Sequence, residues 1–376
     1  MVDQFPAVLV TGARQAGKTS ILRHLYPQAS YLSLDLPANA EAANTAPEQL
    51  LSQYPEPVII DEIQYAPSLL RHLKYRIDEN RSSGRYLLTG SQVFPLMQGV
   101  SESLAGRCAV LNLHTLSRAE LLDADHRAEE TSHIFLGGYP ELHLRAEADL
   151  WFSAYVATYL ERDVRNILRV VDLQDFNRFI RACALRISQV INYSDLARDT
   201  GIAPNTARKW IGLLQTSAIV SLVEPYFGNR TKRLIKSPKL FFLDTGLAAF
   251  LSGFRSENDL FASSLAGAFW ESHVFGQIVK QAASLGSFSP VNFWRTANGP
   301  EVDFVIEQAG GKVIAIECKF KEHPDITDAS GLRALADAEK GRIKEKFVVC
   351  RTQVTYKLSD ETWVVNPSEL LKSLSF

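Results

Sequence analysis

The sequence has few cysteines, no excess of charge of either sign and no long apolar run. Its four cysteines are scattered and form no Cys-x-x-Cys pair, which predicts reduced thiols rather than a disulfide framework or a zinc site. A formal net charge of −2 means that contacts with a polyanion must come from local patches. No apolar run has the length of a membrane span, and the first residues lack the pattern of a signal peptide. We therefore expect a cytoplasmic protein without membrane contact.

The composition is typical of a folded protein with more than one domain. Hydrophobic residues make up 46% and charged residues 22% of the 376 residues, a balance that can bury a core. The length predicts two or three domains. In the first third of the chain, short apolar runs alternate with helical patterns, which predicts an open parallel sheet with helices on both faces. The runs lie at residues 6–12, 31–36, 58–60, 86–88 and 109–113.

A glycine-rich loop of the pattern G-x-x-x-x-G-K-[ST] follows the first apolar run. The glycines let successive backbone N–H groups point into one hollow, and the helix that follows adds partial positive charge where a phosphate lies. Lys18 then supplies charge to the terminal phosphates of ATP, and the Thr19 hydroxyl supplies a ligand for Mg²⁺. A chance glycine-rich loop is the less favoured alternative, because both flanks fit. The residues assigned to ATP binding are Gly12, Ala13, Arg14, Gln15, Ala16, Gly17, Lys18, Thr19 and Ser20.

Polar side chains end the third and fourth apolar runs. Asp61 and Glu62 follow the third run. We expect Asp61 to hold the Mg²⁺ shell and Glu62 to polarise the attacking water as general base. The alternative is a solvated acidic turn. It is less favoured, because the two acids end an apolar strand that follows a phosphate loop. After the fourth run, Ser91 and Thr89 are both candidates for a polar sensor of the γ-phosphate or its water.

Residues 193–215 have the pattern of a helix-turn-helix, with the turn at Gly201. Polar residues on the outer face of the second helix could enter a DNA major groove. Residues 230–239 then hold five basic residues and no acidic one, which suits phosphate contacts from a hairpin wing. The alternative is a structural or protein-contact module whose basic side chains are solvated. DNA is the expected partner, through Arg208, Lys209, Lys232, Arg233 and Lys236.

Three acidic residues and a lysine stand out in the last third of the chain. Asp303 lies on a predicted strand, and Glu317 and Lys319 lie on one face of the next strand. Glu271 lies on a helix before them. Carboxylates with a nearby lysine suit a Mg²⁺ site that activates water, so we expect Glu271, Asp303 and Glu317 as metal ligands and Lys319 as the group that positions water. The alternative, rated nearly equal, is an ion-paired cluster without chemistry, with Glu317 joined to Lys319.

Nine segments spread over nearly the whole chain resemble those of bacterial and archaeal AAA+ ATPases whose second half is a domain of unknown function. They are GARQAGKTS, IIDEIQ, LLTGS, ESLAGR, GGYPEL, YLERDV, PKLFFLDTGL, EVDFVI and IECK. The resemblance implies an α/β protein with an N-terminal AAA+ P-loop parallel sheet. A central helical and winged-helix domain and a C-terminal α/β domain similar to PD-(D/E)XK nucleases would follow. The expected boundaries are 1–122 for the ATPase core, 123–170 for a helical lid or linker, 171–255 for the winged helix-turn-helix and 256–376 for the nuclease-like domain.

The resemblance also implies a role for Arg107, which ends the segment ESLAGR. In AAA+ proteins an arginine before the fifth strand reaches the ATP of a neighbouring subunit, so we expect a homo-oligomer such as a ring. The alternative is an arginine that complements the dipole at a helix C-terminus.

Two functions remain open from the sequence. The first is an ATP-driven enzyme that remodels or cleaves DNA. The second is a nucleotide-switched regulator or clamp, in which the nuclease-like domain is catalytically silent. A P-loop kinase is less favoured, because the sequence has no recognisable lid or acceptor pocket.

Overall fold

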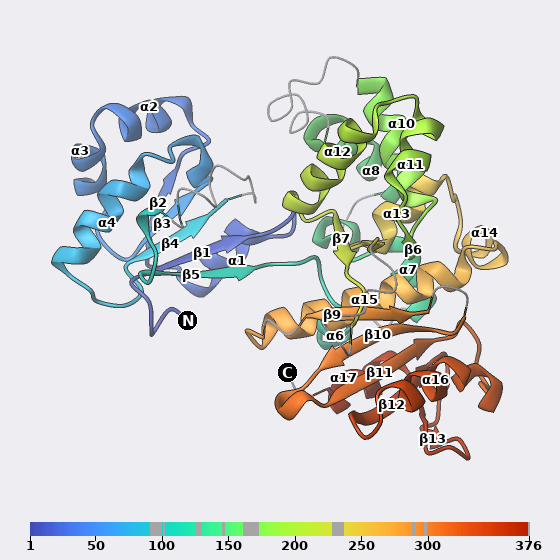
Figure 1. Ribbon diagram of the computed structural model, residues 1–376. Coiled ribbons are helices and arrows are strands. Elements are labelled where there is room, and N and C mark those ends of the chain that lie inside the picture. Colours follow the sequence, from blue (N-terminus) through green and yellow to red (C-terminus); the bar gives the residue numbers. More distant parts are fainter. Residues whose placement is uncertain are drawn as a thin grey trace. The chain divides into compact units, whose positions relative to one another are not determined.

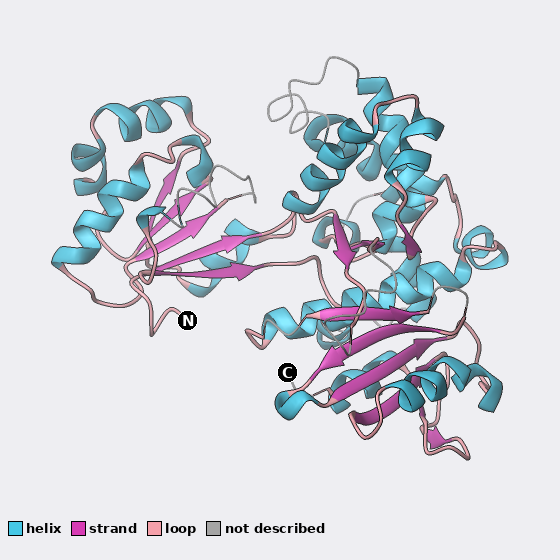
Figure 2. Ribbon diagram, in the orientation of Figure 1, coloured by secondary structure: helices cyan, strands magenta, loops and turns pink. Residues whose placement is uncertain are grey.

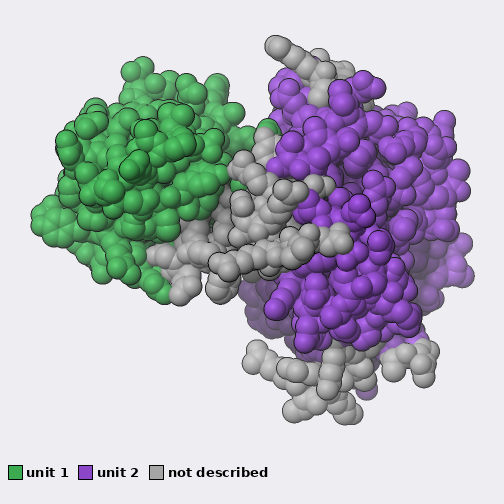
Figure 3. Space-filling view, turned by 90° about the horizontal axis from the view of Figure 1, so that it is seen from above, with its two compact units in different colours: residues 1–115, 216–218 green, residues 116–215, 219–376 purple. Residues whose placement is uncertain are grey.

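The computed structural model describes residues 1–90, 100, 102–124, 129–144, 147–160, 173–227, 237–287, 290–296 and 299–374. The chain forms two compact units (Figure 3). Unit 1 comprises residues 1–115 and 216–218, and unit 2 comprises residues 116–215 and 219–376. In the ranges just given, no helix combines the length and the apolar character needed to cross a membrane.

Unit 1 is built on a five-stranded parallel sheet with the order β2-β3-β4-β1-β5 (Figures 1 and 2). Each predicted apolar run forms one of its strands, so the predicted parallel sheet is confirmed. The strands are β1 Ala7–Thr11, β2 Ser30–Ser33, β3 Val58–Asp61, β4 Tyr86–Thr89 and β5 Cys108–Asn112. The helices are α1 Lys18–Leu25, α2 Pro37–Thr45, α3 Pro47–Ser52 and α4 Leu69–Glu79, with a 3₁₀ turn η1 Ile63–Tyr65.

Both faces of the central strands are buried because their alternate side chains enter different cores. On β1, Ala7 and Leu9 pack into the core that contains the apolar faces of α3 and α4. Val8 and Val10 pack into a second core with Leu22 of α1. Since all five strands run the same way, their carboxyl ends meet at one edge, which is where ligands bind in open α/β sheets. The glycine-rich loop and the carboxylates after β3 lie at that edge.

The first part of unit 2 is helical. Its helices are α6 Arg118–Asp123, α7 Glu130–Leu136, α8 Ala148–Tyr155 and α10 Leu173–Ala184, with a 3₁₀ turn η2 Pro140–His143 and a π-helical turn η3 Val156–Leu160. Of the helical lid or linker expected at 123–170, residues 125–128, 145–146 and 161–170 lie outside the described residues.

A helix-turn-helix packed on a small antiparallel sheet follows. The helices are α11 Tyr193–Thr200 and α12 Pro204–Thr216, and the sheet has the order β6-β8-β7. Asn192 caps α11 by accepting from the N–H groups of Ser194 and Asp195, and Gly201 ends it at φ 75°. The turn therefore lies where the sequence predicts it. The strands are β6 Gln189–Val190, β7 Val220–Val223 and β8 Lys239–Phe242.

A six-stranded mixed sheet with the order β13-β14-β12-β11-β10-β9 ends unit 2. Its strands are β9 Val291–Arg295, β10 Glu301–Glu307, β11 Val313–Cys318, β12 Ile343–Val349, β13 Tyr356–Lys357 and β14 Trp363–Val365. The helices of this part are α13 Thr245–Ser252, α14 Glu257–Ala262, α15 Ala266–Ser284, α16 Ser330–Ala338 and α17 Pro367–Ser373, with 3₁₀ turns η4 Ala309–Gly311 and η5 Ile326–Ala329.

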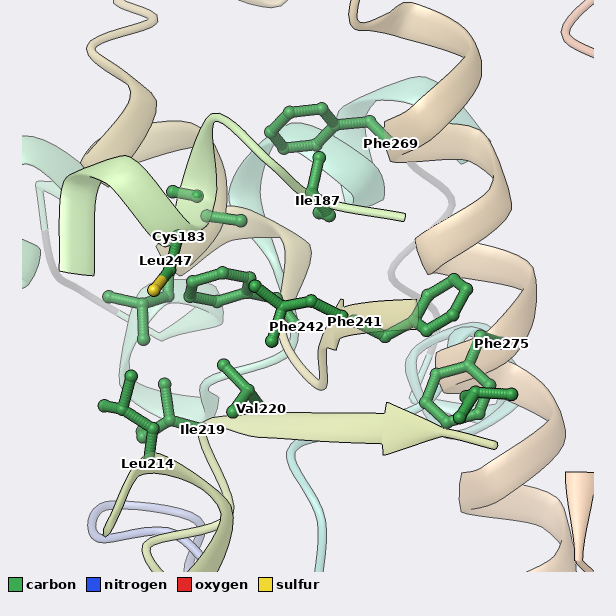
Figure 4. Packing of buried hydrophobic residues seen from close by; sticks show 14 of the residues in the cluster. Cys183, Ile187, Leu214, Ile219, Val220, Phe241, Phe242, Leu247, Phe269 and Phe275 are labelled. Atoms are coloured by element: carbon green, nitrogen blue, oxygen red, sulfur yellow. The ribbon is translucent and has the colours of Figure 1, made fainter. Parts of the chain in front are cut away.

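One hydrophobic core joins the helix-turn-helix to this sheet. Figure 4 shows Phe241 of β8 meeting Phe275 of α15, with ring centroids 4.7 Å apart, while Phe242 lies on the other side of the strand near Leu247. Phe241 also contacts Phe304 of β10. The strand β8 thus lies between the two parts of unit 2 and fixes its first residue, Lys239, close to the C-terminal sheet.

Candidate functional site

The glycine-rich loop of unit 1 depends on backbone conformations that favour glycine. Gly12 has φ 136°, and a Cβ atom there would lie 2.0 Å from the carbonyl oxygen of Leu113. Gly17, just before α1, has φ 92°, and Gln15 between them has φ 62°. The loop can therefore curl tightly from the end of β1 into the first turn of α1.

Lys18 is buried inside this loop. Its Nζ donates hydrogen bonds to the carbonyl oxygens of Gly12 at 3.1 Å and Ala13 at 2.9 Å. The ammonium group therefore lies within the hollow that the loop encloses. Of the other loop residues assigned from the sequence, Ala16 is buried, Arg14 is half-buried, and Gln15 and Ser20 are exposed.

Asp61 is the centre of a hydrogen-bond cluster at the carboxyl edge of the sheet. Its Oδ1 accepts from the Thr19 hydroxyl at 2.6 Å and from the Thr89 hydroxyl, and its Oδ2 accepts from the Tyr31 hydroxyl at 2.8 Å. Burial and this hydrogen bond raise the pKa of Tyr31 to about 12, so the phenol remains a donor. The structure thus brings Thr19 and Asp61 together, as the motifs predict, and adds Thr89 and Tyr31. Ser91, the other sensor candidate, lies outside the described residues.

Glu62, next to Asp61, has an unusual backbone conformation. It adopts the left-handed region at φ 57°, which costs a non-glycine residue roughly 1–3 kcal/mol and is found mainly at functional sites. Its N–H donates to the Thr89 hydroxyl at 3.1 Å, and its Oε2 accepts from the amide of Gln64. Gln64 was not singled out from the sequence. It fixes the direction of the Glu62 carboxylate at the edge where Lys18 and Thr19 also lie.

Arg107 lies at the opposite edge of the sheet, before β5. Its guanidinium donates to both carboxylate oxygens of Asp78, at 2.7 and 3.0 Å, and its carbonyl oxygen accepts from the N–H of Ala7 at the start of β1. The five residues of β1 at about 3.3 Å each place it roughly 16 Å from the glycine-rich loop. Arg107 therefore does not reach the loop of its own chain.

A second polar cluster lies in unit 2 around Lys239, whose side chain is 4% exposed. Its Nζ contacts Glu271 Oε1 at 2.8 Å, Asp303 Oδ1 at 3.5 Å and the carboxylate of Glu301. The ring of Phe293 covers another side of the ammonium, 5.5 Å from its centroid. The sequence grouped Lys239 with the basic run and did not connect it to the acidic residues.

Glu317 and Lys319 form an ion pair of 2.7 Å at the end of β11. Asp303 Oδ2 accepts from the N–H of Cys318 at 2.8 Å. Burial and the charge of Asp303 raise the pKa of Glu317 to about 8, and the same two causes raise the pKa of Glu271 well above its usual range. Burial favours a lower pKa for Lys239, but the surrounding carboxylates have the larger combined effect. The pKa of Lys239 is therefore raised. The pKa values of Glu271 and Glu317 are raised by burial and by neighbouring carboxylate charge, and carboxylate charge also raises the pKa of Lys239.

These residues do not form the open set of oxygen ligands that the predicted Mg²⁺ site requires. Glu271 and one oxygen of Asp303 face Lys239, the other oxygen of Asp303 faces an N–H group, and one oxygen of Glu317 faces Lys319. Glu317 Oε2 is buried and accepts no hydrogen bond. Across the described part of the chain, no group of three or more His, Cys, Asp or Glu side chains is arranged to hold a metal ion. In the structure, a lysine ammonium lies among the acids that the sequence predicts as metal ligands.

The predicted DNA-contacting residues are described only in part. Arg208 and Lys209 are exposed on α12, and the Arg208 guanidinium lies over the ring of Tyr193, 4.8 Å from its centroid. Lys232, Arg233 and Lys236 lie outside the described residues.

Three models of known protein families match successive parts of the chain. Residues 4–122 match the family model of an AAA domain. Residues 128–258 and 266–371 match two domains of unknown function, DUF8612 and DUF4143. The solved structure of Thermotoga maritima RuvB T158V aligns with 16% identity over 57% of this chain and 81% of that chain. Its TM-score of 0.30 is too low to support a functional comparison.

The fold of unit 1, its phosphate loop and the AAA match define the class of the protein, an AAA-type P-loop ATPase. The uncharacterized protein Rv2008c of Mycobacterium tuberculosis is 30% identical over 369 residues, which are 97% of this chain and 81% of that protein. The uncharacterized protein Mb2031c of Mycobacterium bovis matches with the same figures. The chain belongs to the family of these two proteins, with an N-terminal AAA domain and a C-terminal DUF4143 domain.

Proposed function

We propose that this protein binds and hydrolyses Mg·ATP at the carboxyl edge of the unit 1 sheet. The observation that carries the proposal is a hydrogen-bonded cluster of three residues. In it, Asp61 Oδ1 accepts from the hydroxyl groups of Thr19 and Thr89. Hydroxyl and carboxylate oxygens are the ligands that Mg²⁺ prefers, and Thr19 directly follows the phosphate loop in sequence. This arrangement fits a metal held between the loop and β3.

Each residue of the site has a role in this proposal. Lys18 would exchange its two loop carbonyl partners for phosphate oxygens when ATP binds. Thr19 and Asp61 would hold Mg²⁺, which when bound neutralises the negative charge of the β- and γ-phosphates. Glu62 would accept a proton from the attacking water as Gln64 holds its carboxylate in place. Thr89 would sense the phosphate through its contacts with Asp61 and with the Glu62 N–H.

Two substitutions test the site. Glu62→Gln should retain ATP binding and lower the hydrolysis rate by about 10²–10⁴-fold, because the general base is lost while the loop is intact. Lys18→Ala should weaken ATP binding itself, because the loop loses its cation. Titration calorimetry measures the binding, and phosphate release measures the rate.

Exposed residues of the same unit supply the matched controls. Glu79→Gln and Lys74→Ala change the same residue types on α4 and should leave both quantities unchanged. Hydrolysis by Glu62→Gln at the wild-type rate would exclude Glu62 as the base.

A second part of the proposal is that the ATPase acts on DNA through α12. The helix-turn-helix of α11 and α12 with its three-stranded sheet has the element order of a winged helix, and Arg208 and Lys209 are exposed on its second helix. Stacking on Tyr193 holds the Arg208 guanidinium in one direction, which lowers the entropy lost when it binds a phosphate. This supports DNA contact over a merely solvated face.

The salt dependence of duplex binding tests this part. Neutralising Arg208 and Lys209 should weaken binding and reduce the slope of log affinity against log salt by about 0.9 for each lost phosphate contact. Neutralising Lys232, Arg233 and Lys236 tests the basic run in the same way. Arg198→Ala, which removes one positive charge at an exposed position of α11, is a control. An unchanged affinity and slope in both sets would assign these residues to solvent or to a protein partner.

A further inference from the structure

Lys239 and the carboxylates around it come from three elements that are far apart in sequence. Lys239 begins β8, Glu271 lies on α15, and Glu301 and Asp303 lie on β10. The ammonium is almost wholly buried, and it contacts carboxylate oxygens of Glu271, Glu301 and Asp303. Burying a lysine requires compensation by charge, because an unpaired ammonium loses its hydration. The cluster is therefore built around a cation that the chain itself supplies.

A divalent metal at this position would need the same oxygens. Mg²⁺ and Mn²⁺ bind carboxylate oxygens in a close shell and repel a neighbouring ammonium. The oxygens of Glu271 and Asp303 that would face the metal face Lys239 instead. A metal and the Lys239 ammonium therefore exclude each other.

The remaining oxygens do not make a second site. Asp303 Oδ2 accepts from the Cys318 N–H, and Glu317 Oε1 accepts from Lys319. Glu317 Oε2 is buried and without a hydrogen-bond donor, and Glu317 itself is 8% exposed. This oxygen is where a cation could bind if the neighbouring charges were released.

We propose that Lys239 is the resident cation of this acidic cluster, so that the C-terminal domain holds no divalent metal there while Lys239 is in place. The ammonium also ties β8 of the helix-turn-helix sheet to β10 and α15 of the C-terminal part. Its role is to join these elements and to prevent the carboxylates from binding a metal ion. The proposal does not depend on ATP binding.

The test is Mn²⁺ binding in an Asp61→Asn background, which removes the metal carboxylate of unit 1. Titration calorimetry and the electron paramagnetic resonance signal of free Mn²⁺ report the binding. The background protein should bind no Mn²⁺ at the cluster, and Lys239→Met should gain one bound ion there, because a unit positive charge is removed from beside the ligands. Adding Asp303→Asn should abolish the gain.

Three variants control this experiment. Lys239→Arg keeps the charge and should gain no site, and Lys372→Met changes an exposed lysine and should behave like the background. If Lys239→Met alone does not fold, the double variant Lys239→Met/Glu271→Gln takes its place. The double variant removes one charge of each sign and keeps Asp303 and Glu317 as ligands. A background protein that binds one Mn²⁺ and loses it on Asp303→Asn would overturn the proposal. A folded Lys239→Met protein that gains no Mn²⁺ would also overturn it.

Mg²⁺-dependent cleavage of duplex, flap or branched DNA gives a second readout. The proposal expects no cleavage by the wild-type protein. Cleavage that Asp303→Ala abolishes would overturn it, and an ATPase-active protein without cleavage would support it.

Discussion

Tyr31 is the residue of the ATP site that no motif indicates. It lies on β2, which pairs with β3, and its hydroxyl donates to Asp61 Oδ2 while Thr19 and Thr89 donate to Oδ1. The Arg23 guanidinium lies over its ring at 5.0 Å from the centroid. Tyr31 thus fixes the rotation of the carboxylate so that Oδ1 faces the phosphate loop. It is a positioning residue for the proposed magnesium site.

Tyr31→Phe tests this role. A hydrogen bond to a charged group contributes about 1.5–3 kcal/mol. If part of this energy is lost in Tyr31→Phe, half-maximal ATPase activity should require a roughly three- to tenfold higher Mg²⁺ concentration. The maximal rate at saturating Mg²⁺ should change little. Tyr75→Phe, at an exposed position of α4, is the control. The same Mg²⁺ midpoint in Tyr31→Phe and wild type would remove Tyr31 from the site.

The sequence predicted the residues of this site that lie in contiguous motifs. Lys18 and Thr19 follow from the glycine-rich pattern, and Asp61 from an apolar strand that ends in acid. Tyr31 could not be predicted, because its contact with Asp61 crosses from β2 to β3 and leaves no pattern along the chain. Lys239 was missed for the same reason: in sequence it belongs to a basic run, and only the pairing of β8 brings it to the acids.

At the scale of elements, the predictions were most accurate for buried apolar strands and for helices with clear end signals. All five strands of unit 1 and the two helices of the helix-turn-helix lie where expected. The short β13 and β14, with two and three residues, were not predicted, since so few residues cannot establish an alternation. Of the same sheet, β10 with Asp303 and β11 with Glu317 were expected.

Asp244 joins two of the segments that carry the family resemblance. Its Oδ1 accepts from the Leu247 N–H and caps α13, and its Oδ2 accepts from the N–H of Gly138 in the GGYPEL segment. A Cβ atom on Gly137 would lie 2.2 Å from Asp244 Oδ1, so glycine is required at that point. One buried carboxylate therefore joins α13 to the segment that follows α7.

Asp244→Ala should destabilise unit 2 by about 2–4 kcal/mol, the sum of a lost helix cap and a buried N–H without an acceptor. Urea unfolding followed by circular dichroism measures the change. Ser256→Ala removes a more exposed cap, that of α14, and should cost only about 1 kcal/mol. Equal losses in the two variants would show that Asp244 acts as a cap alone and does not join the segments.

At the scale of the whole molecule, Arg107 is too far from the phosphate loop of its own chain to act on ATP there. Any action of Arg107 on ATP therefore requires a second copy of the chain. Its ion pair with Asp78 is partly exposed, with side chains 21% and 37% accessible, and such surface pairs contribute about 0–1 kcal/mol. A neighbouring subunit could therefore release the arginine at little cost. The alternative, a role limited to pairing with Asp78 at the end of α4, requires no partner.

Mixing two inactive variants distinguishes these roles. Arg107→Ala protein keeps an intact phosphate loop, and Lys18→Ala protein keeps the arginine, so neither should hydrolyse ATP by itself. In a closed ring assembled at random from equal amounts, about one interface in four combines an intact loop with an intact arginine and should recover activity. Asp78→Ala, which frees Arg107, should keep the wild-type rate. If subunits demonstrably exchange and no activity returns, or if the protein is monomeric at the assay concentration, Arg107 has no role in a neighbour's site and pairs with Asp78 as a structural residue.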